Sequence, residues 1–180
     1  MKLLIASDIH GSLLYTQKLA DIYRAAGADR LILLGDLLYH GPRNDLPEGY
    51  DPKGVFALLN SMKDEILCVR GNCDADVDQM VLDFPITPES MWLYLDGQPV
   101  FATHGHIWGR GNPPLIGRKD ILLNGHTHLP AAEDTGRFIY LNPGSISLPK
   151  DGNKHSYMVY ENRKFTVLSL DGEPICSYAF

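Results

Sequence analysis

Residues 2–11 read KLLIASDIHG, an apolar segment that runs directly into a polar turn. The apolar run from Leu3 to Ala6 suits a buried strand. Asp8, His10 and Gly11 follow it at once, so the strand ends in a turn that carries two side chains able to bind a metal. Ligands of α/β proteins bind at such carboxyl ends of strands, and glycine allows the close turn there.

The same pattern recurs four more times along the chain. Apolar runs lead into turns that combine glycine with polar side chains: 31–34 into Gly35-Asp36, 66–69 into Gly71-Asn72, 101–102 into His104-Gly105-His106, and 121–123 into Gly125-His126-Thr127-His128. If these strand ends meet, side chains far apart in the sequence form one site.

The segments between these runs predict the rest of the fold. Helices are expected after Ser12, ending at Gly27, and over 52–62, because both segments have an apolar face. Residues 91–95 and 99–103 predict a hairpin, and 155–160, 164–170 and 174–178 predict further strands. Alternating strands and helices followed by strands alone favour two sheets with helices outside them, in a single domain over residues 1–180.

Composition excludes several classes of protein. The formal net charge of −6 argues against a basic nucleic-acid binder, and three cysteines do not make a disulfide framework. The apolar run at residues 3–6 is too short for a secretory signal, and no run has the length of a membrane span. We therefore expect a cytoplasmic protein with no membrane and no specific nucleic-acid partner.

The polar side chains in the five turns indicate a metal site. Carboxylate and amide oxygens mixed with imidazole nitrogens suit Mn²⁺, Zn²⁺, Fe, Co²⁺ or Ni²⁺, and we expect Mn²⁺. Eight candidate side chains are too many for one ion, and they fit two ions about 3.5–4 Å apart. The reading that competes with this one is that ordinary turn residues merely cap strand ends.

The five motifs stand in the order that is typical of the calcineurin-like metallophosphoesterases, which this sequence resembles from residue 8 to 128. Asn142-Pro143-Gly144-Ser145 adds a signature of the small bacterial branch; by itself it reads as a turn whose polar groups brace the site. The resemblance implies an α/β (α+β) fold, a four-layer αββα sandwich of two mixed β-sheets flanked by helices.

The resemblance also implies the roles of the side chains. It places the first metal on Asp8, His10, Asp36 and His128, and the second on Asp36, Asn72, His104 and His126. Asp36 then bridges the ions, and a hydroxide between them attacks phosphorus. Asn72 is also assigned to the catalytic group, together with His106, the candidate for contacting the phosphate or the leaving group.

Two positions depart from the wider family. Cys73 stands where the phosphatases carry the histidine that is the proposed general acid, and His40 stands where they carry an arginine that grips phosphate. A neutral thiol is a poor proton donor, so the source of the leaving-group proton stays open. We read Cys73 as a packing residue and Asp74 as a structural one.

A metal-dependent phosphodiesterase acting on a small phosphodiester is the first hypothesis. The alternatives are a phosphomonoesterase that uses the same metals and a non-catalytic scaffold of the Vps29 kind, which has lost part of the metal set. The complete set of ligands favours catalysis. Because the C-terminal strands are apolar and could leave an edge for pairing, we also expect a homodimer or higher homo-oligomer.

Overall fold

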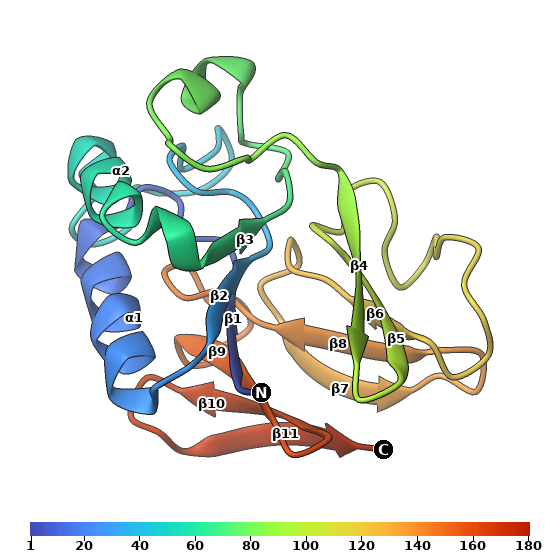
Figure 1. The fold of residues 1–180 in the computed structure, drawn as a ribbon. Coiled ribbons are helices and arrows are strands. Elements are labelled where there is room, and N and C mark those ends of the chain that lie inside the picture. The colour runs from blue at the N-terminus through green and yellow to red at the C-terminus, as the bar shows by residue number, and fades with distance from the viewer.

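The computed structural model describes residues 1–180 and contains two mixed β-sheets (Figure 1). The strands of the first sheet are β1 Leu3–Ala6, β2 Arg30–Leu33, β3 Ile66–Cys68, β9 Ser156–Glu161, β10 Lys164–Ser169 and β11 Pro174–Ala179. Those of the second are β4 Ser90–Leu95, β5 Gln98–Thr103, β6 Ile121–Leu123, β7 Pro130–Asp134 and β8 Ile139–Pro143. The sheet orders are β11-β10-β9-β1-β2-β3 and β4-β5-β6-β8-β7.

Strand β1 shows why its sequence is apolar throughout. Leu3 and Ile5 belong to a cluster of 16 buried residues that comes from both sheets and fills the space between them. Leu4 and Ala6 point to the other side, into a cluster of 21 buried residues shared with the helices. A strand covered on both faces needs a continuous apolar run, as the sequence predicted.

Both α-helices pack on the outer face of the first sheet (Figure 1). Helix α1, Leu13–Ala26, begins after Ser12, whose side chain accepts a hydrogen bond from the Tyr15 N–H, and ends at Gly27 with φ of 59°. Helix α2, Pro52–Asn60, begins after Asp51, which caps it, and ends two residues before the predicted 62. The helix starts and the sandwich of two mixed sheets are therefore confirmed.

A loop forms the fourth layer, over the outer face of the second sheet. Phe101, Leu122 and Tyr140 are buried there, with Trp108 and Ile116 packed against them from the segment between β5 and β6. Glycines at 105, 109 and 111 and prolines at 113 and 114 prevent this segment from forming a helix.

Strands β7 and β8 were not predicted, although every residue of β8 is buried. The sequence prediction treated the region around Asn142 as a turn, whereas Asn142 and Pro143 end strand β8. Strand β8 runs parallel to β6, and β6 to β5, while β1, β2 and β3 are mutually parallel in the first sheet. No helix has both the length and the apolar character needed to cross a membrane.

Candidate metal centre

The predicted ligand turns have an unusual backbone. Ten non-glycine residues have positive φ, and five of them are predicted metal ligands: Asp8, His10, Asp36, His126 and His128, with φ between 51° and 64°. Left-handed backbone is unfavourable for side chains with a Cβ and occurs mainly at sites where the surrounding structure imposes it. The chain therefore holds these five side chains in strained turns, which fixes their direction.

The Asn142–Ser145 motif braces two of these turns. Ser145 and Ser147 both donate hydrogen bonds to the Asp8 carbonyl, at 2.9 and 2.8 Å. The Asn142 amide donates to the Gly125 carbonyl at 2.7 Å and so ties the turn that carries His126. The predicted bracing role of this motif is confirmed.

Asp74 connects the turn after β2 with the turn after β3. Its buried carboxylate accepts backbone N–H bonds from Asp36 at 2.9 Å, Leu37 at 2.8 Å and Gly71 at 2.7 Å. Three donors on one carboxylate hold Asp36 in register with the neighbouring Asn72 turn. Asp74 is thus structural, as predicted, and it acts directly on the position of Asp36.

Three of the histidines are held in the same way. The Nδ1 atom of His10 lies 2.9 Å from the Tyr39 carbonyl, that of His104 lies 2.7 Å from the Leu34 carbonyl, and that of His128 bonds the Leu148 carbonyl. A carbonyl can only accept, so each Nδ1 carries the proton and each Nε2 faces the site with its lone pair. Metal-binding histidines are oriented by this kind of bond.

The donor atoms crowd together without satisfying one another. The Nε2 atoms of His10 and His128 are 3.3 Å apart, and neither carries a proton to share when the rings are neutral. Asp8 Oδ1 is buried, has no hydrogen-bond partner, and lies 3.2 Å from His128 Nε2. A cation is the partner that these facing lone pairs lack, so the donor set fits a metal.

Asp36 stands between two groups of donors. Its Oδ2 lies 3.6 Å from His10 Nε2 and 3.4 Å from His104 Nε2. The cluster contains three groups of residues, and within each group the donor atoms all lie within 4.8 Å of one another. The groups are Asp8, His10 and His128; Asp8, Asp36 and His104; and His10, Asp36 and Cys73. This arrangement suits the predicted bridging role of Asp36, because one carboxylate reaches both sides of the cluster.

The electrostatics of the cluster keep its carboxylates ionised. Burial opposes ionisation of Asp8, but interactions with the adjacent His10 and His128 rings hold its pKa well below the usual value. Burial likewise opposes protonation of His104, yet its hydrogen bond to Asp36 and the charges of Asp8 and Asp36 raise its pKa to about 9. Without a metal, protonation of His104 compensates the buried carboxylates, which also raise the pKa of His10 against the effect of burial.

The remaining predicted ligands lie at the open side of the cluster. Asn72 is exposed, with Oδ1 3.1 Å from His104 Nε2. His126 is half-buried; its backbone N–H donates to Asp8 Oδ2 at 3.0 Å, and burial together with nearby His104 lowers its pKa to about 4.

His106 lies outside this group. It is exposed, and its ring centre is 5.4 Å from that of His104 and 6.2 Å from that of His126. It lines a neighbouring cavity of about 350 Å³ together with Asn124 and Arg110. The contact between His106 and a phosphate or leaving group stays a prediction.

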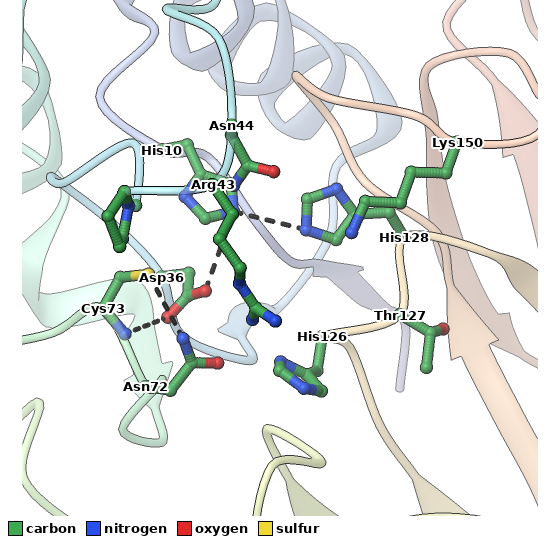
Figure 2. A pocket seen from close by; sticks show the side chains of 12 residues that line it. His10, Asp36, Arg43, Asn44, Asn72, Cys73, His126, Thr127, His128 and Lys150 are labelled. Atoms are coloured by element: carbon green, nitrogen blue, oxygen red, sulfur yellow. Dashed lines mark hydrogen bonds and ion pairs between the residues drawn. The ribbon is translucent and has the colours of Figure 1, made fainter.

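A pocket of about 390 Å³ opens above the ligands (Figure 2). Its lining includes two cations that the sequence prediction did not name, Arg43 and Lys150. The signal available for Arg43 is its loop, rich in proline and glycine, which starts three residues after Asp36. Lys150 follows β8, a strand that was not recognised, so nothing in the sequence pattern pointed to it.

Cys73 lies in the same pocket as a protonated thiol. Its backbone N–H donates to Asp36 Oδ1 at 2.7 Å, which adds a further bond to the carboxylate. Burial and the charge of Asp36 raise the pKa of the Cys73 thiol to about 12. A thiol of that pKa is neither a ready nucleophile nor an effective acid at neutral pH.

The chain matches known proteins over most of its length. Residues 1–164 match the model of the calcineurin-like phosphoesterase superfamily domain. The chain is 48% identical to phosphodiesterase YfcE of Escherichia coli K12, covering 97% of this chain and 95% of that protein. It is 27% identical to the probable metallophosphoesterase YsnB of Bacillus subtilis, covering 95% and 91%.

Solved structures give the same result. The structure of the phosphoesterase YfcE from E. coli superposes with a TM-score of 0.97 at 48% identity and covers 99% of both chains. Vps29 of Entamoeba histolytica in complex with Zn²⁺ has a TM-score of 0.66 at 20% identity, covers 99% of both chains and shares the fold. The chain therefore belongs to the calcineurin-like phosphoesterase family.

Proposed function

We propose that this protein is a metal-dependent phosphodiesterase that hydrolyses small phosphodiesters at the candidate metal centre. The observation that carries the proposal is the set of facing donor atoms: the Nε2 atoms of His10 and His128 at 3.3 Å, and the unpartnered Asp8 Oδ1 beside them. The 48% identity to a protein named a phosphodiesterase supports the reaction class.

Two divalent ions are the expected occupants. Asp8, His10, Asp36 and His128 would hold one, and Asp36, Asn72, His104 and His126 the other. When bound, such ions would polarise the phosphoryl oxygens and lower the pKa of water so that it could serve as the nucleophile at neutral pH. We propose Mn²⁺ as the native metal, with Zn²⁺, Fe, Co²⁺ and Ni²⁺ as alternatives, since imidazole mixed with oxygen donors suits these ions.

The chain itself keeps the donors ready for this chemistry. The carbonyls of Tyr39, Leu34 and Leu148 hold the Nδ1 protons, which directs each Nε2 atom into the site, where a metal would replace any proton it carries. The neutral Cys73 thiol does not protonate the leaving group. We propose that His106 contacts the leaving group from the neighbouring cavity and that Asn72 acts at the open side.

The two alternatives make different use of the same residues. A phosphomonoesterase would need to hold a dianion, and the cations Arg43 and Lys150 in the pocket favour keeping this candidate. A scaffold of the Vps29 kind shares the fold, but here every predicted ligand is present in the chain. The 48% identity to a protein named a phosphodiesterase makes hydrolysis of a diester the first candidate of the three.

Hydrolysis of bis(p-nitrophenyl) phosphate and of p-nitrophenyl phosphate, each with Mn²⁺, tests these functions. We expect faster turnover of the diester and loss of turnover after removal of divalent ions. Asp36→Asn should lower turnover by more than about a hundredfold, because losing a metal ligand should cost more activity than losing a residue that only orients a ligand. Its circular dichroism should match that of the wild type.

Three outcomes would contradict the proposal. Wild-type turnover by Asp36→Asn would remove the bridging role, and preference for the monoester would select the monoesterase. Lack of turnover with bound Mn²⁺ would favour the scaffold.

We also propose a location and partners for the protein. All three cysteines are free, which suits the reducing cytoplasm. We propose a small phosphodiester as substrate, no specific nucleic-acid or membrane partner, and a homodimer or higher homo-oligomer.

A further inference from the structure

Arg43 and Lys150 are the two cations of the pocket above the metal centre, and neither has a partner. Each is exposed, and neither makes an ion pair or side-chain hydrogen bond within the chain. Some other cations of this protein do pair, such as Arg110 with Glu133 at 2.7 Å and Arg70 with Asp76 at 3.0 Å. Figure 2 shows Arg43 extending into the space between Asn72 and His126, with Lys150 alongside His128.

The backbone that presents Arg43 is fixed. The Asn44 side chain donates to the His40 carbonyl at 2.8 Å, and the Asn44 N–H lies 3.4 Å from the Gly41 carbonyl, which closes a turn around residue 43. Gly41 has φ of 82°, and a Cβ there would lie 3.1 Å from Cys73 Sγ. The turn is thus seated against the pocket wall, and only glycine fits that position without strain.

The backbone that presents Lys150 is fixed as well. Both the N–H and the side-chain amide of Asn153 donate to the Lys150 carbonyl, at 3.0 and 2.9 Å. Two residues earlier, the Leu148 carbonyl holds His128, and Leu148 N–H donates to Ser145 at 2.8 Å. The segment that orients His128 therefore also positions Lys150. In the same way, the loop that carries Arg43 orients His10 through the Tyr39 carbonyl.

The charges of the pocket indicate what the two cations bind. Asp8 and Asp36 are the carboxylates of the ligand cluster, and two divalent ions would exceed their charge by two. Arg43 and Lys150 add two more positive charges above the cluster. A singly charged diester does not need this excess, whereas a phosphate dianion gains about twice as much Coulomb energy from each cation.

We propose that Arg43 and Lys150 form an anion clamp that binds the phosphate oxygens from above the metal centre and holds phosphate dianions more tightly than monoanionic diesters. The inference rests on the proposed function, because the clamp acts on the phosphate that the centre is proposed to hydrolyse. It follows that the released monoester or phosphate competes with the substrate, so the enzyme is inhibited by dianionic products.

Inorganic phosphate is the probe for this clamp. Its affinity for the Mn²⁺-loaded protein is measured by calorimetry, and its inhibition constant and the KM are measured with bis(p-nitrophenyl) phosphate. Arg43→Gln and Lys150→Gln should each weaken phosphate binding by about tenfold or more, since a hydrogen bond to a charged group contributes that much. The KM for the diester should rise by less than the inhibition constant of phosphate does.

Matched variants separate the clamp from general effects. Arg24→Gln removes an exposed arginine at the end of α1 that pairs with Asp21, and should leave phosphate affinity at the wild-type value. Arg43→Lys keeps the positive charge but lacks the paired N–H donors of the guanidinium. Its phosphate affinity should therefore lie between that of Arg43→Gln and that of the wild type. Mn²⁺ affinity should be unchanged in all four variants, because none of the substituted residues is a proposed ligand.

The outcomes distinguish the clamp from the reaction. If Arg43→Gln and Lys150→Gln bind phosphate as the wild type does, or if they lose Mn²⁺ affinity, the clamp is wrong. If the wild type binds phosphate through these residues but hydrolyses neither ester, the clamp stands and the proposed function fails.

Discussion

The candidate metal centre has a buried half and an open half. Asp8, His10 and His128 are at most 3% exposed, and carbonyls hold both of these imidazoles. Asn72 is exposed, and the His126 ring is held by no side-chain hydrogen bond although its backbone is. The difference indicates that the buried half is prepared for a metal before the ion arrives, while the open half leaves room for substrate.

Asp74 joins the buried turn that carries Asp36 to the Asn72 turn of the open half, and its removal should have the largest effect. Asp74→Ala leaves the N–H groups of Asp36, Leu37 and Gly71 without their acceptor, and each costs about 1–3 kcal/mol when buried. We expect the free energy of unfolding in urea to fall by about 3 kcal/mol or more.

The matched control for Asp74 is a neighbouring carboxylate. Asp76→Ala removes an exposed residue that pairs with Arg70, and should change stability by less than about 0.5 kcal/mol. Equal effects of the two substitutions would show that Asp74 does not hold the turns together.

Proton release on metal binding should differ between the buried His104 and the half-buried His126 of the open half. Burial opposes the charged form, but the carboxylates raise the pKa of His104 to about 9, while the pKa of His126 is about 4. At pH 7.5 Mn²⁺ should displace about one proton from His104 and none from His126. Calorimetry in buffers of different ionisation enthalpy measures this release, which should fall to about half at pH 9 and continue to fall at higher pH.

The same pKa has a consequence for the metal-free protein. Since the folded value of about 9 lies above the ordinary 6.5, His104 adds stability that is complete below pH 6.5 and is lost as the pH rises through 9. His126→Ala should keep the proton release and His104→Ala should lose it. Release that persists in His104→Ala would assign the proton to another group.

The seryl bonds to the Asp8 carbonyl should give the smallest effect. Ser147→Ala removes one of two donors and should cost about 1 kcal/mol in thermal or urea unfolding. The double change with Ser145→Ala should cost more than the sum, because the buried carbonyl then has no partner. A strictly additive result would mean that solvent replaces the lost bonds and that Asp8 is less enclosed than the structure indicates.

Repeated local patterns made most of this fold predictable. Each apolar run followed by a glycine turn lies at a strand end of the structure, and Ser12 and Gly27 bound α1 as their chemistry requires. Strand β8 escaped because Asn142 and Pro143 read as a turn, although they are buried between neighbouring strands. Pairing with β6 is a long-range contact that no local pattern contains.

The candidate site was predictable only as a set of donor side chains. Asp8, Asp36 and the histidines were predicted because they follow the five apolar runs and have side chains that can bind a metal. Sequence spacing did not show that Asp74 sits beneath Asp36, or that Arg43 and Lys150 share one pocket. Such relations arise where loops from different strands meet, and they depend on the tertiary fold.

The positive φ angles of the five predicted metal ligands lower the stability of the protein, and a variant that does not need a metal could avoid this cost. A side chain at positive φ costs about 1–3 kcal/mol in strained positions, and glycine relieves much of that cost. Substituting His126 or His128 by glycine therefore removes a ligand and relaxes the backbone at once. A lineage released from catalysis would gain stability at these positions first, and an engineer seeking a robust inert scaffold has the same five residues as starting points.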